Sequence, residues 1–151
     1  MAKEIERKFM VKNESYMTEA ENSVEIAQGY LSIHPDRTVR VRIAGERGFM
    51  TVKTRNVGAV RGEWEFEIPI EDAREILSQA AVGVLSKTRY YVPSSDGFTW
   101  EIDKFHGSLE GLAIAEIELP DEQTPFALPP FAGKEVTGDP RYYNSNLATQ
   151  V

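Results

Sequence analysis

Hydrophobic and polar residues alternate with a period of two along most of this chain. Such alternation is typical of β-strands that have one apolar face and one polar face. Turn-forming sequences separate several of these segments, as at Gly45–Gly48 and Ser94–Gly97. The pattern predicts eight strands, which span Lys3–Val11, Val24–Ser32, Thr38–Ala44, Gly48–Arg55, Gly62–Ile70, Val84–Val92, Phe98–Phe105 and Leu112–Leu119.

Helical spacing is much rarer than strand alternation. It predicts one helix over Glu71–Ala81 and shorter helices over Ser15–Ala20 and Pro140–Ala148. The predicted fold class is therefore α+β, mainly antiparallel β. Eight strands favour a closed or nearly closed β-barrel with a few helices packed outside, because closure leaves no exposed strand edge. The sequence contains no linker and no repeat, so residues 1–151 are interpreted as a single domain.

Aromatic residues indicate where the core lies. Trp64 and Trp100 fall on apolar strand faces and are expected to be buried. The Pro-rich segment Pro120–Pro130 carries Phe126 and is followed by Phe131, which predicts an ordered loop against the body of the domain.

The polar faces of the strands carry pairs of like charge two residues apart. The acidic residues on these faces are Glu4, Glu6, Glu63, Glu65, Glu67, Glu101, Asp103, Glu116 and Glu118. The basic ones are Lys8, Arg40, Arg42, Lys53, Arg55, Lys87 and Arg89. Neighbours at this spacing lie about 7 Å apart on one face and repel each other unless opposite charge lies between them. The alternative is a β-sandwich whose charged face is simply solvated.

Composition narrows the chemistry of this charged face. The chain has no cysteine and only two histidines, His34 and His106, so thiolate zinc sites and three-histidine sites are excluded. Carboxylates without these ligands suit Mg²⁺ or Mn²⁺, and lysines with arginines suit a polyphosphate. If the sheet closes with this face inward, the lumen becomes a polar tunnel. The residues therefore favour metal-assisted phosphoryl transfer on a compact polyanion.

The remaining features limit the partners. A net charge of −7 argues against general binding to nucleic acid. No stretch approaches the ~20 apolar residues of a membrane span, and the charged N-terminus is unlike a signal peptide. We therefore expect a cytoplasmic protein without a membrane partner. His34 is expected in a turn and His106 in a structural or rim position, while Tyr142 and Tyr143 suit either packing or the tunnel mouth.

One short motif carries a family resemblance. Glu4-Ile5-Glu6-Arg7-Lys8 resembles the Glu-x-Glu-x-Lys signature of the CYTH superfamily, the triphosphate tunnel metalloenzymes. Blocks similar to those of the family follow in the same order, including Val39–Arg42, Arg61–Glu65, Trp100–Phe105 and Ala115–Leu119. The chain is most similar to the short bacterial inorganic triphosphatases.

The resemblance implies an eight-stranded tunnel that hydrolyses a triphosphate with Mg²⁺ or Mn²⁺, with two ions expected. It implies that Glu4, Glu6 and Glu118 hold the first ion and that Asp103 and Glu116 help to hold the second. These five carboxylates and Lys8 form the expected catalytic set. The phosphates would be bound by Lys8, Arg40, Arg42, Lys53, Lys87 and Arg89. Glu63 and Glu65 are expected to support them, whereas Arg55, Glu67 and Glu101 are weaker candidates near strand ends.

Several functions remain open at this stage. The leading hypothesis is hydrolysis of tripolyphosphate to diphosphate and phosphate by water. Alternatives are a thiamine triphosphatase or nucleoside triphosphatase, an adenylate cyclase, and a non-catalytic module that binds polyphosphate or nucleotides. The partner is a small-molecule triphosphate in most of these cases, and a homodimer is one assembly that the sequence allows.

Overall fold

A single antiparallel sheet forms the body of the protein in the computed structural model, which describes residues 3–80 and 82–151. The strands run β5-β4-β3-β2-β6-β7-β8-β1-β9 in space. Their bounds are β1 Lys3–Val11, β2 Asn22–His34, β3 Arg37–Ala44, β4 Arg47–Lys53, β5 Val60–Ile68, β6 Leu85–Pro93, β7 Thr99–Phe105, β8 Ala113–Glu118 and β9 Ala132–Glu135.

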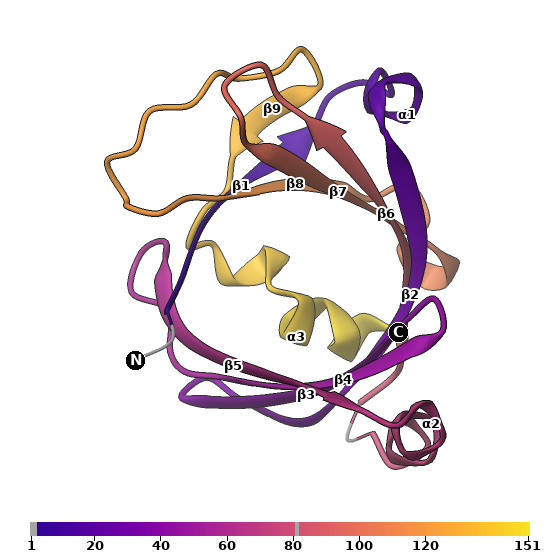
Figure 1. Ribbon diagram of the computed structural model, residues 1–151. Coiled ribbons are helices and arrows are strands. Elements are labelled where there is room, and N and C mark those ends of the chain that lie inside the picture. The colour runs from indigo at the N-terminus through magenta and orange to yellow at the C-terminus, as the bar shows by residue number, and fades with distance from the viewer. Residues whose placement is uncertain (1–2, 81) are drawn as a thin grey trace.

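The first strand closes the sheet into a barrel. One edge of β1 pairs with β8 over Glu6–Met10, while Lys3–Ile5 pair with β5 on its other edge. The result is a closed eight-stranded ring (Figure 1). The predicted antiparallel barrel is confirmed, and the sandwich alternative is excluded because the charged faces point into the ring. The sequence did not predict β9. This strand pairs with Phe9 and Val11 at the C-terminal end of β1, on the edge that β5 leaves free there.

The helices occupy two different places. The outer ones, α1 (Tyr16–Glu19) and α2 (Ile70–Leu77), pack outside the ring, whereas α3 (Asn144–Leu147) lies within it in the view of Figure 1. Helix α2 ends before Ser78, earlier than the predicted Ala81, which falls outside the described residues. No helix in the described part of the chain is long and apolar enough to cross a membrane.

The C-terminal segment is broken rather than a single helix. The 3₁₀ turn Pro140–Tyr142 and α3 are separated by the extended backbone of Tyr143, and a further 3₁₀ turn covers Ala148–Gln150. A fourth short element, the 3₁₀ turn Gly107–Leu109, connects β7 to β8. The break at Tyr143 matters for the site described below.

The main core lies on the outer surface of the barrel wall. Trp100, Phe9 and Phe131 are buried there with edge-to-face ring contacts, and Tyr16 of α1 packs on Phe131. Phe126 packs on the same cluster, which agrees with the ordered loop predicted over Pro120–Pro130.

The prediction that Trp64 is buried is wrong. Helix α2 covers the neighbouring part of this face, where a Cβ on Gly48 would lie 2.7 Å from that of Ala73. The outer face of β5 carries Trp64 and Phe66 beyond this contact, and Phe66 is 58% exposed. Alternation identified the correct face of the strand, but burial depends on which element covers it.

We expect Phe131→Ala to lower the free energy of unfolding by about 3–5 kcal/mol, because it removes a fully buried ring from the outer core. Leu128→Ala in the same loop is the control, since Leu128 is 62% exposed and should cost less than about 0.5 kcal/mol. Urea denaturation measures the free energy of unfolding of each variant. Equal decreases would contradict the burial of Phe131 in the outer core.

Candidate active site

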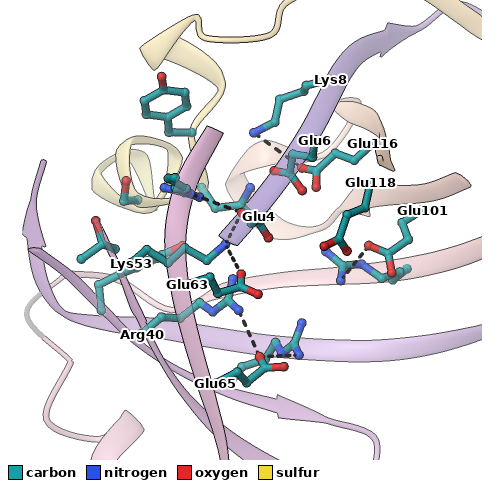
Figure 2. Close-up of a pocket in the computed structure, with 18 of the residues that line it drawn as sticks. Glu4, Glu6, Lys8, Arg40, Lys53, Glu63, Glu65, Glu101, Glu116 and Glu118 are labelled. Atoms are coloured by element: carbon teal, nitrogen blue, oxygen red, sulfur yellow. Dashed lines mark hydrogen bonds and ion pairs between the residues drawn. The ribbon is translucent and has the colours of Figure 1, made fainter. Parts of the chain in front are cut away.

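All eight strands of the barrel contribute side chains to one pocket in its lumen (Figure 2). The basic residues that line this lumen pocket are Lys8, Arg40, Arg42, Lys53, Arg61, Lys87 and Arg89. The acidic ones are Glu4, Glu6, Glu63, Glu65, Glu101, Glu116 and Glu118. The described lining therefore carries seven groups of each sign, so its formal charges cancel, whereas the whole chain carries a formal net charge of −7.

Nearly every site residue expected from the sequence lies in this pocket. The exception is Asp103, which is not among the lining residues and lies beneath Lys87 and Arg89. Of the three weaker candidates, only Glu101 reaches the pocket. Arg55 and Glu67 instead form exposed ion pairs with Asp36 and Arg47.

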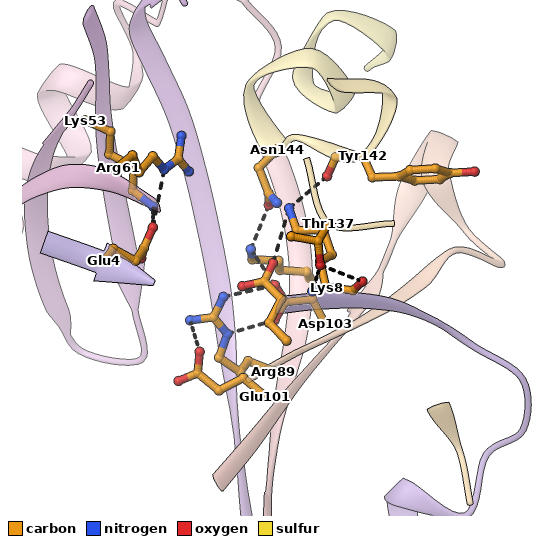
Figure 3. Close-up of polar contacts among 12 residues, drawn as sticks. Glu4, Lys8, Lys53, Arg61, Arg89, Glu101, Asp103, Thr137, Tyr142 and Asn144 are labelled. Atoms are coloured by element: carbon orange, nitrogen blue, oxygen red, sulfur yellow. Dashed lines mark hydrogen bonds and ion pairs between the residues drawn. The ribbon is translucent and has the colours of Figure 1, made fainter. Parts of the chain in front are cut away.

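Asp103 anchors two cations at the base of the pocket (Figure 3). Its carboxylate oxygens lie 2.8 Å from Lys87 Nζ and 2.7 Å from Arg89 Nε. Burial opposes the charge of Asp103, but Arg89 and Lys87 outweigh it and hold the pKa of this carboxyl well below its usual range. Burial lowers the pKa of the Lys87 ammonium to about 8 despite this partner. As the side chains stand, Asp103 therefore acts as a support for two phosphate-binding candidates.

A second charge cluster joins β1, β4 and β5. Lys53 Nζ lies 3.3 Å from Glu4 and 3.1 Å from Glu63, and Arg61 Nε lies 3.3 Å from Glu4. Burial opposes ionisation of Glu4, yet Lys53 and the other neighbours lower its pKa to about 2. Burial and a hydrogen bond with Glu4 raise the pKa of Glu63 to about 7. The two carboxylates share one lysine, and their pKa values are pushed in opposite directions.

Arg61 is a site residue that the sequence reasoning missed. It contacts Glu4 and lines the pocket, and it lies on the same face of β5 as Glu63 and Glu65. Extending the alternation one step back from Glu63 would have found it.

Some carboxylates face each other directly across neighbouring strands. Glu6 is in register with Glu118, and Glu101 is in register with Glu116. Like charges in such positions destabilise a sheet. Burial, Glu116 and Glu4 raise the pKa of Glu6, and burial followed by Glu4 raises that of Glu118. A divalent cation fits this donor set because it would offset the repulsion. As the side chains stand, no three acidic or histidine groups within residues 3–80 and 82–151 already converge on a metal position.

The two ends of the barrel interior differ in polarity. The side chains of Glu65 and Glu101 are 35% and 38% exposed, which marks the open mouth, whereas Lys87 is 1% exposed. Beyond Lys87 the inward positions become apolar, and Leu147 and Ala148 of the C-terminal segment pack on Leu85 and Phe105. The expected polar tunnel is therefore polar along only part of its length.

The C-terminal segment also supplies lining residues, of which the sequence had raised only Tyr143 and left it undecided. Tyr143, Asn144 and Ser145 line the pocket, and Lys8 Nζ lies over the Tyr143 ring. The Tyr142 carbonyl accepts a hydrogen bond from Lys8 Nζ, while the Tyr142 side chain packs on the apolar cluster. Tyr143 therefore belongs to the site, and the Tyr142 ring belongs to the packing.

The two histidines lie outside the lumen pocket. His34 is the last residue of β2, directly before the turn at Pro35 and Asp36, and its Nδ1 accepts a hydrogen bond from the amide of Asp36. His106 Nε2 lies 2.7 Å from Thr88 Oγ1 on the other face of β6 from Lys87.

Comparison with known proteins agrees with this geometry. Residues 2–143 match the CYTH domain family. The chain belongs to this family. An inorganic triphosphatase of Acetivibrio thermocellus is 49% identical over 97% of this chain and 94% of the relative. One of Nitrosomonas europaea is 38% identical over 98% of each chain. A crystal structure of an inorganic triphosphatase superposes on this CYTH protein with a TM-score of 0.71 at 34% identity, covering 100% of this chain and 97% of the other.

We expect Asp103→Asn to lower the free energy of unfolding by about 3–5 kcal/mol with divalent cations chelated, because it leaves buried Lys87 and Arg89 without their carboxylate. Asp36→Asn is the matched control at an exposed ion pair and should leave the urea midpoint nearly unchanged. Equal midpoints for the two variants would show that Asp103 does not support these cations.

Proposed function

We propose that this CYTH protein is an inorganic triphosphatase that hydrolyses tripolyphosphate to diphosphate and phosphate. The observation that carries the proposal is the charge-balanced lumen, in which basic groups suited to phosphate face carboxylates suited to divalent cations. The two relatives from Acetivibrio thermocellus and Nitrosomonas europaea are inorganic triphosphatases, which supports the same reaction.

The basic side chains favour a compact phosphate chain. The Nε atoms of Arg40 and Arg42 are buried and have no hydrogen-bond partner within the described part of the chain. Unpartnered buried donors of this kind favour an anionic ligand, because leaving them unsatisfied is costly. We assign phosphate binding to Lys8, Arg40, Arg42, Lys53, Lys87 and Arg89, and the structure suggests adding Arg61.

The carboxylates favour a substrate that arrives with cations. Because the formal charges of the lining cancel, a tripolyphosphate alone would bring negative charge that the lining does not fully compensate. We propose that Glu4, Glu6 and Glu118 hold one Mg²⁺ or Mn²⁺ and that Glu116, with Asp103 if it leaves its two cations, holds a second. The ions would supply charge neutralisation on phosphate oxygens and a more acidic bound water.

The chain's own side chains would bind the phosphates, orient them and stabilise the charge that develops during hydrolysis. Arg40 and Arg42 would give bidentate contacts to phosphate oxygens, and Lys87 would give a point charge at the base of the pocket. Lys53 and Lys87, freed from Glu4 and Asp103, would stabilise charge that develops on the leaving diphosphate and the attacked phosphoryl group. Glu63, which lies 3.1 Å from Lys53 and whose pKa is raised beside Glu4, would keep Glu4 and Lys53 oriented.

The cellular location and the oligomeric state of the protein remain predictions. We propose a cytoplasmic protein whose partner is a small-molecule triphosphate rather than nucleic acid, since the formal charges of the lumen lining cancel whereas the whole chain carries a formal net charge of −7. A homodimer is a prediction that sedimentation would test.

The proposed reaction predicts that the purified protein releases phosphate from tripolyphosphate in the presence of Mg²⁺ or Mn²⁺ and stops when a chelator is added. The same assay should compare thiamine triphosphate, ATP and diphosphate, with cyclic AMP measured on ATP. If an organic triphosphate is turned over faster than tripolyphosphate, it would become the assigned substrate. If the protein binds these compounds without turnover, it would be a non-catalytic binding module.

Glu6→Gln should reduce tripolyphosphate hydrolysis by at least about 100-fold while the far-UV spectrum and urea midpoint are retained, because it removes one proposed metal ligand from a carboxylate cluster. Glu67→Gln is the matched control, since Glu67 pairs with Arg47 outside the pocket. Wild-type activity in Glu6→Gln would contradict the metal assignment.

A further inference from the structure

The lumen pocket is closed at its inner end by the C-terminal segment. Leu147 and Ala148 are buried among inward-facing apolar residues, which fixes Asn144 at the base of the charged region. The exposed side chains of Glu65 and Glu101 lie at the opposite end. A ligand therefore enters from one side and meets Asn144 at the end of its path.

The orientation of the Asn144 amide is set by its neighbours. Its Oδ1 accepts hydrogen bonds from Lys87 Nζ at 2.8 Å and from Gln28 Nε2 at 3.2 Å, and Asn144 is labelled in Figure 3. The ammonium of lysine only donates, so an oxygen must face it. The amide nitrogen then carries two N–H groups, which make no hydrogen bond to any described residue although Asn144 lines the pocket.

Asn144 has two chemical functions in this arrangement. Its oxygen contacts Lys87 at the base of the pocket, and its nitrogen has two N–H groups without a partner among the described residues. A phosphate oxygen is a strong acceptor for such donors, while Lys87 and Lys8 supply the opposite charge on either side of the segment.

We propose that Asn144 binds the free terminal phosphoryl group of the substrate, so that the site selects triphosphates with at least one unsubstituted end. This inference rests on the proposed triphosphatase function and deepens it. Because the inner end is closed, a chain cannot thread through the barrel, and only a terminal phosphoryl group reaches Asn144 and Lys87. A substituent on the far phosphoryl group of the triphosphate would point toward the mouth. A triphosphate substituted on both terminal phosphoryl groups would place one of its substituents against Asn144.

The first test removes the donors and keeps the acceptor. Asn144→Asp retains an oxygen for Lys87 and Gln28 but presents no N–H to the ligand. We expect tripolyphosphate with Mg²⁺ to bind about tenfold or more weakly by calorimetry, as for the loss of one hydrogen bond to a charged group. Gln150→Glu, an exposed amide-to-acid change nearby, is the control and should bind as the wild type does. Unchanged affinity in Asn144→Asp would overturn the proposal.

The second test separates end recognition from support of Lys87. The probes are P¹-methyl triphosphate, with one free end, and P¹,P³-dimethyl triphosphate, with none. We expect the wild type to prefer the monomethyl probe by about tenfold or more, and Asn144→Ala, which makes room for a methyl group, to reduce that preference severalfold. A role confined to holding Lys87 would weaken both probes equally and leave the ratio unchanged, which would overturn the proposal.

The same measurements distinguish failure of this inference from failure of the proposed function. If wild-type protein neither binds nor hydrolyses tripolyphosphate, both fail together. If it does so and the two Asn144 variants behave as the wild type, only the end-recognition proposal fails.

Discussion

The need to match buried charge inside a closed barrel is the constraint on which the rest of this structure depends. Closure directs the polar face of every strand inward, where a carboxylate or ammonium without a partner is costly. Most of these groups are paired, as Asp103 is with Lys87 and Arg89. The register nevertheless places Glu6 opposite Glu118, and Glu101 opposite Glu116. This residual repulsion is what a divalent cation would relieve.

The protein supports this interior by moving its hydrophobic core to the outside of the wall. Trp100 and Phe131 pack there beneath the β8–β9 loop and α1, so the barrel does not need an apolar filling along its whole length. Only the inner end is filled, by the C-terminal segment. Rigid outer packing and a closed inner end together hold the charged groups in a pocket that opens at one mouth.

Ligand binding in such a pocket amounts to an exchange of partners. Lysines and arginines that pair with carboxylates in the free protein would turn to phosphate oxygens, and the released carboxylates would turn to cations. Cations that arrive with the substrate would offset most of its negative charge. The pKa of Lys87, lowered to about 8 by burial, and that of Glu63, raised to about 7 by burial, show how close these groups are to changing their charge.

The sequence alone determined eight of the nine strands and most of the residues that line the lumen pocket, because a period of two assigns each side chain to one face of a strand. This period therefore placed Glu4, Glu6 and Lys8 on one face. Applied to Arg61, two residues before Glu63, it would have placed that residue on the charged face as well. Closure of the sheet then decided that the charged face turns inward. Only the tertiary structure decided depth and neighbours: it placed Asp103 behind the lumen, left Trp64 exposed and brought Asn144 to Lys87. The physical reason is that periodicity is local, whereas burial and partners arise from contacts between segments far apart in the chain.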